Sequence, residues 1–163
     1  MKVIIFLSAL SLLLLNCAEV REALPPPQEA TVTGLSDEML QAVNRLRESG
    51  CRCGNRRMPP APPLDWDSRL AAAARRHAED MSNRGFFDHR GSDGSKVGTR
   101  ARDAGFAWRH IGENIAYNYG NVPEVVSGWQ NSPAHCRNLM SPDFRSMGAA
   151  YQSGYWVQVL GAE

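Results

Sequence analysis

Three polar motifs follow one another in this chain: Phe86-Phe87-Asp88-His89, then Gly112-Glu113-Asn114-Ile115-Ala116, then Trp129-Gln130-Asn131-Ser132-Pro133-Ala134-His135-Cys136. His89, Glu113 and His135 stand far apart in the sequence, and each lies in a compact, unusual context. Side chains so distant meet only if a fold gathers them, which is how active and metal sites are commonly built. The motifs therefore predict one site assembled from three segments.

The residue types of this site suit zinc. Two imidazoles and a carboxylate are a known ligand set, with a fourth position open to water. Glu113 precedes apolar Ile115 and Ala116, and a buried carboxylate needs a partner. We expect His89, His135 and Glu113 to bind zinc weakly, with no cofactor required for folding. The alternative is a hydrogen-bonded cluster of these side chains that only holds the three segments together.

Helical and strand patterns place these motifs on a mixed fold. Helices are expected from Leu35 to Gly50, from Asp67 to about Arg84, over 95–104, from Asn121 to Asn131 and over 133–140. Met147–Tyr151 and Tyr155–Leu160 read as an antiparallel hairpin, and Cys51–Pro63 reads as a proline-rich loop. The predicted class is α+β: a single-domain α-β-α sandwich with a small antiparallel sheet flanked by helices.

Several charged and polar residues receive structural rather than functional interpretations. His77 lies on the inward stripe of the second helix with Leu70, Ala74 and Met81, so we expect a core histidine. His110 reads as a surface or packing residue. The short basic pairs are expected on solvated faces rather than in a nucleic-acid patch: Arg56-Arg57, Arg75-Arg76 and Arg100-x-Arg102.

The N-terminal residues indicate export. Lys2, the apolar run Val3–Leu15 and Cys17 predict a signal peptide over 1–17, with a lipobox in which Cys17 is acylated. Ordinary cleavage and a freely secreted protein are the alternative. Residues 18–34, which contain three consecutive prolines, read as a tether, and 35–163 as the domain. Without the segment carrying Lys2, acidic and basic residues balance, so we expect no nucleic-acid partner.

The remaining cysteines fit an oxidising compartment. Cys51, Cys53 and Cys136 predict one disulfide from the Cys51/Cys53 pair to Cys136, with one thiol left over. A zinc site made from these three cysteines and His135 is the alternative.

The chain resembles the CAP superfamily of cysteine-rich secretory proteins, insect venom antigen 5 and plant pathogenesis-related proteins, in its short bacterial branch. The resemblance covers about Leu35 to Gly161. It rests on the motifs above and on further segments in the same order: Pro63-Leu64-Asp65-Trp66, the alanine-rich helix to Met81, Asp93-Gly94, Ala104-Gly105-Phe106 and Tyr155-Trp156-Val157-Gln158.

The resemblance implies an α-β-α sandwich and a cleft tetrad of two histidines and two acids. His89, Glu113 and His135 match three tetrad positions, but the fourth falls on Ser132, which weakens any carry-over of hydrolase chemistry. The resemblance also favours Cys53 as the partner of Cys136.

Three functions compete. The first is a monomeric binding module of the cell envelope, for a lipid, a small apolar ligand or an envelope protein, held to the membrane if Cys17 is acylated. The second is a metal-dependent hydrolase or peptidase, and the third is a structural envelope protein. The missing acid at Ser132 favours binding over catalysis.

Overall fold

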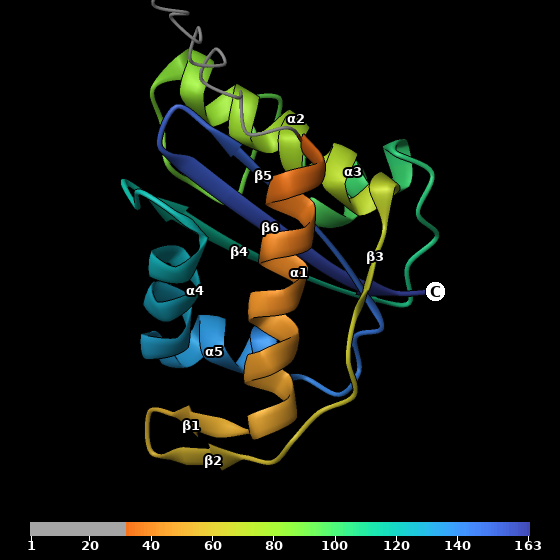
Figure 1. Ribbon diagram of the computed structural model, residues 1–163. Helices are drawn as coiled ribbons and strands as arrows, with labels where there is room; N and C mark the ends of the chain where they lie inside the picture. Colours follow the sequence, from red (N-terminus) through yellow and green to blue (C-terminus); the bar gives the residue numbers. More distant parts are fainter. Residues whose placement is uncertain (1–31) are drawn as a thin grey trace, which may run out of the picture.

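The computed structural model describes residues 32–163 and consists of a four-stranded sheet between two layers of helices (Figure 1). The strands follow the order β3-β5-β6-β4: β3 (Asp65–Trp66), β4 (His110–Tyr117), β5 (Ser146–Gln152) and β6 (Tyr155–Ala162). One layer holds α1 (Val32–Ser49), α4 (Val122–Asn131) and α5 (Pro133–Met140), and the other holds α2 (Ser68–Arg84) and α3 (Val97–Asp103). The predicted class and sandwich are confirmed.

Side chains alternate between the two faces of the sheet along β4 and β6, and each face has its own apolar core. In β4, Ile115 packs in the core with α2, whereas Ala116 packs in the core with α1 and α4. In β6, Val157 and Val159 face α2, and Trp156 and Leu160 face the opposite layer. Successive side chains of a strand point to opposite faces, so this parity also fixes where the polar residues of β4 point.

Helix α2 packs very closely on β5. Asp67 caps its start by accepting from the backbone N–H groups of Arg69 and Leu70, and Gly85 ends it with φ 66°. A Cβ at Gly148 in β5 would lie 2.0 Å from the backbone nitrogen of Ala71. Glycine at that position is what lets the helix backbone lie against the strand.

Two segments differ from the sequence-based expectations. α1 begins at Val32, three residues before the expected start at Leu35, so Ser36 lies inside the helix. Gly34 costs a helix only about 1 kcal/mol relative to alanine, which does not end it.

The expected loop from Cys51 also contains a hairpin, β1 (Cys51–Cys53) paired with β2 (Arg56–Met58). The prolines that suggested a loop all follow β2. Beyond them, Asp65–Trp66 forms the short strand β3, which pairs parallel to β5 and had no sequence signal.

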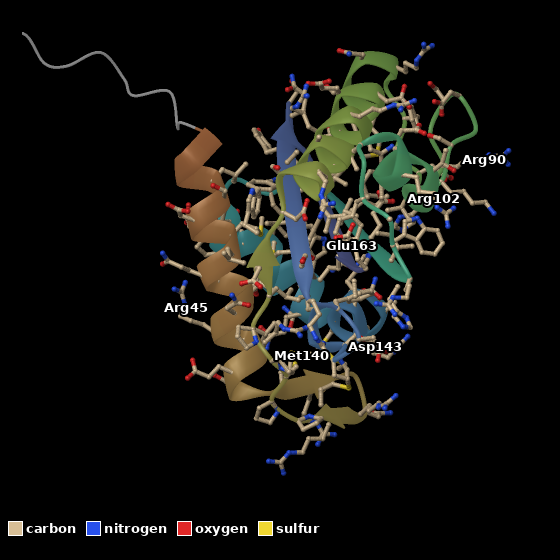
Figure 2. The ribbon with its side chains drawn as sticks, turned by 90° about the vertical axis from the view of Figure 1, so that its right-hand side faces the viewer. Arg45, Arg90, Arg102, Met140, Asp143 and Glu163 are labelled. Carbon is tan, nitrogen blue, oxygen red and sulfur yellow. A yellow bond between two sulfur atoms is a disulfide. The ribbon has the colours of Figure 1, made fainter. Side chains whose placement is uncertain are left out.

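A disulfide joins this hairpin to α5. It links Cys53 to Cys136, as expected, and Cys51 is the free thiol. Met140 of α5 lies toward the hairpin (Figure 2) and packs in the small core formed by Cys53, Met58, Ala61 and Cys136. The disulfide therefore ties together two elements that share an apolar contact.

A buried arginine makes a second tie in this region. Arg47 of α1 donates to the carbonyl oxygens of Pro62, Leu139 and Ser141 at 2.7–3.0 Å. Burial, with the nearby charge of Arg145, lowers the pKa of Arg47 to about 10. A cation at the C-terminal carbonyls of α5 is favourably placed for the helix dipole.

The predicted signal peptide and lipobox lie outside the described residues. Within 32–163, no helix combines the length and the apolar character that crossing a membrane requires.

Replacing Gly148 with alanine is expected to destabilise the domain by about 3 kcal/mol, because backbone must move to admit the methyl group. Denaturant unfolding measures the loss. Gly120→Ala is the matched control, since a Cβ there meets only the flexible carboxylate of Glu124 at 3.3 Å. Equal stabilities for the two variants would contradict the close packing of α2 on β5.

Candidate functional site

Glu113 is the centre of the candidate site. Its side chain is 2% exposed, and strand parity directs it to the face covered by α2 and α3. His89 Nδ1 donates to Oε1 at 2.8 Å, and Arg100 Nη2 donates to Oε2 at 2.7 Å. His77 Nε2 lies 4.0 Å from Oε1. Both carboxylate oxygens are therefore engaged by cationic or ring nitrogens.

Arg100 is the residue that sequence reasoning missed. The expectation of a solvated Arg100-x-Arg102 face is wrong for Arg100, which is 2% exposed. Its guanidinium also donates to the carbonyl oxygens of Ser95 and His89. Arg102, two residues later, points outward and stacks on Trp108 (Figure 2). The short helix α3 carries too few apolar residues for sequence to show which arginine faces inward.

His89 comes from the loop after α2 and has a 57% exposed side chain. Its hydrogen bond to Glu113, and the charge of that carboxylate, raise the pKa of His89 above its ordinary value. No hydrogen bond to its Nε2 is found among residues 32–163. Glu113 thus orients the ring while leaving the second nitrogen available to a ligand.

His135 approaches from the other layer. It lies in the first turn of α5, half-buried, and Asn114 of β4 contacts its backbone carbonyl at 3.4 Å. Burial lowers the pKa of His135, and the charge of His89 lowers it further. β4 is an edge strand, and the two histidines belong to segments that contact it from opposite faces of the sheet.

The predicted zinc site of His89, Glu113 and His135 stays a prediction. In the described chain, the group of three or more potential ligands within 4.8 Å of one another is Cys51, Cys53 and Cys136. Ser132, the predicted cleft residue, is half-buried between α4 and α5 and makes no side-chain capping bond.

His77 has the structural place expected of it. Its side chain is fully buried, and Nε2 donates to the carbonyl of Asp88 at 2.8 Å, which holds the segment that carries His89. Burial is the main cause of the lowered pKa of His77. His110 is exposed, as expected.

Side chains from α4 and α5 cover the edge of β4. Asn138 Nδ2 donates to the carbonyl of Glu113 and Trp129 Nε1 to that of Ile115, at 3.1 and 3.2 Å. Asn138 also donates to the buried Asn114, which in turn donates to Gln158. This polar network fixes the strand that carries Glu113 against the helix that carries His135.

Replacing Arg100 with methionine is expected to destabilise the domain by about 3–5 kcal/mol, because Glu113 would be left as a buried carboxylate without its cation. Denaturant unfolding measures this. Arg102→Met is the matched control on the same helix, with a loss of about 1 kcal/mol from the exposed stack on Trp108.

Adding Glu113→Gln to Arg100→Met should recover part of the stability, since it removes the unpaired charge. Equal losses in the Arg100 and Arg102 variants would refute the buried ion pair.

Comparison with known proteins is consistent with this architecture. A fold like this one occurs in an extracellular protein with an SCP domain from Bacillus anthracis, with a TM-score of 0.67, 21% identity, and coverage of 85% of this chain and 45% of that one. An outer surface protein from Borrelia burgdorferi also has a TM-score of 0.67, with 18% identity over 78% of this chain and 93% of that one.

Two relatives found by sequence have a higher identity than these structures, but their matches cover a smaller part of this chain. Two Bacillus subtilis proteins, the uncharacterized membrane protein YlbC and the uncharacterized protein YkwD, are each 34% identical, over 58% and 59% of this chain. The matched regions span only 28% and 38% of those proteins. The model of the cysteine-rich secretory protein family matches residues 40–160, so this chain belongs to the CAP family.

Proposed function

We propose that this protein is an exported CAP domain that binds a ligand at the His89–Glu113–His135 edge of its sheet, with Glu113 as the residue that orients His89 rather than as a general base. The observation that carries this proposal is the full engagement of Glu113. A general base needs an acceptor within reach of the proton that it removes. Both oxygens of Glu113 already accept, from His89 and from Arg100.

The residue at the fourth tetrad position supports the same proposal. Ser132 stands where the family has a second acid, and its hydroxyl does not act as an acid or base at neutral pH. The site keeps two imidazoles and Glu113 but lacks the second acid, which weakens any carry-over of hydrolase chemistry from the family.

A row of aromatic rings near the site suits a ligand with an apolar part. Phe87 and Tyr117 are 51% and 53% exposed, and their ring centroids lie 6.5 Å apart. Tyr117 also contacts the ring of Tyr155, at 4.6 Å. Phe87 is two residues before His89, and Tyr117 ends the strand that carries Glu113. Large apolar rings exposed side by side commonly mark interaction sites.

His89 and His135 are the residues that would hold a metal ion. The bond from Nδ1 to Glu113 fixes the tautomer of His89, the arrangement in which the other nitrogen serves as a ligand. A bound zinc ion would supply a Lewis acid for an oxygen of the ligand.

Export is part of this proposal. The run from Lys2 to Cys17 supports a signal peptide, and acylation of Cys17 would make the protein a lipoprotein of the cell envelope. Without acylation, the same domain would be secreted. The extracellular or surface location of two structural neighbours agrees with either outcome.

Replacing both Phe87 and Tyr117 with serine is expected to weaken binding of a fluorescent fatty-acid probe by about tenfold or more, since each lost ring removes about 1 kcal/mol of contact. Fluorescence titration measures the change in Kd. Tyr151→Ser is the control, because Tyr151 is 47% exposed but packs on Trp156 instead. Probe binding unaffected by the double variant would remove the apolar part of the proposal.

Zinc is expected to bind reversibly to the wild type and to be lost in His89→Ala/His135→Ala. Affinity should decline as pH falls, because protons compete for the imidazoles. Glu113 raises the pKa of His89, so the decline should begin above about pH 6.5, the ordinary histidine value. Calorimetric titration at several pH values tests this. Unchanged binding in the double variant would rule out the shared site.

A further inference from the structure

Three sulfur atoms meet where the β1–β2 hairpin joins α5. Cys51 and Cys53 are two residues apart in β1, so strand alternation directs both side chains to the same face. Cys53 is bonded to Cys136, and the free Sγ of Cys51 lies 3.5 Å from Sγ of Cys136 and 3.9 Å from Sγ of Cys53. The free thiol is thus in contact with both sulfurs of the disulfide.

Cys51 is the member of this cluster that reaches solvent. It lines a pocket of about 560 Å³ beside Arg52, Arg57 and Met58, a pocket that neither disulfide sulfur lines. Cys53 is 2% exposed and Cys136 is fully buried. An external reagent therefore meets Cys51 before it meets the bridge.

We propose that Cys51, Cys53 and Cys136 form a thiol–disulfide exchange site in which the bridge moves between Cys53–Cys136 and Cys51–Cys136. The Cys51 thiolate attacks Sγ of Cys136, and a new S–S bond forms as the old one breaks. The electron pair leaves on Sγ of Cys53, which takes up a proton in place of the one that Cys51 released. The step is redox-neutral and needs no outside oxidant or reductant.

The two bridges have nearly equal loop-closure entropies. They would join residues 83 and 85 positions apart, so the loops that they close are nearly equal in length. Neither isomer gains from loop length. The similar distances to the two bridged sulfurs place Sγ of Cys51 beside the S–S bond, so the Cys51 side chain must turn before it can attack Sγ of Cys136 in line. Because Cys136 follows His135, the exchange changes which hairpin residue is tied to the turn that carries this candidate ligand.

Burial raises the pKa of the Cys51 thiol, which makes the exchange slow at neutral pH. Alkaline incubation should therefore start the exchange, and acid should stop it by protonating the attacking thiolate.

Mapping of the free thiol tests the proposal. Oxidised protein is incubated at about pH 10, well above the ordinary thiol pKa of about 8.5 because burial raises the pKa of Cys51, then acid-quenched, unfolded and labelled with a maleimide. Trypsin cleaves after Arg52 and so separates the peptides of Cys51 and Cys53. The two peptides should carry label in amounts within about tenfold of each other. Label confined to the Cys51 peptide at all times would overturn the proposal.

Two variants sharpen the result. Cys53→Ser should form a Cys51–Cys136 bridge on oxidation and leave no free thiol among residues 32–163, whereas Cys51→Ser should keep the original bridge unchanged throughout the incubation. A folded Cys53→Ser protein with two free thiols after oxidation would refute exchange. If that variant does not fold, the distribution of label in the wild type decides the question.

Discussion

The buried ion pair of Arg100 and Glu113 is the interaction on which the site depends. A carboxylate that is 2% exposed is costly unless its oxygens are paired, and Arg100 pairs one of them from α3. The same guanidinium binds the carbonyls of Ser95 and His89, so one side chain holds the strand, the short helix and the loop of the exposed histidine. Glu113 in turn orients the His89 ring by accepting a hydrogen bond from its Nδ1.

The position of β4 at the edge of the sheet explains how residues from both layers come together. Neighbouring residues of a strand point to opposite faces, so Glu113 serves the α3 side and Asn114 serves the α5 side. Only at an edge can groups from the two faces approach without an intervening strand. An uncovered edge invites pairing with another chain, and Trp129 and Asn138 use their N–H groups to occupy carbonyls there.

Much of this arrangement could be predicted from sequence. The helix starts at Asp67 and Asn121, the helix end near Arg84 and the antiparallel hairpin of β5 and β6 are local signals, and the structure confirms them. The motif order also identified the family and the partner of Cys136. The burial of Arg100 and Arg47 could not be predicted, because each depends on carbonyls supplied by other segments. A long cationic side chain reads as solvated until those acceptors are placed.

Helix α1 separates the two ends of the domain. Its 18 residues span roughly 27 Å, from Val32 at one end to the β1–β2 hairpin at the other (Figure 1). The sulfur cluster of the hairpin and the start of the helix are therefore about five helical turns apart. A change in the bridge would act on α5 and the hairpin, which lie at the far end of α1 from its first turn.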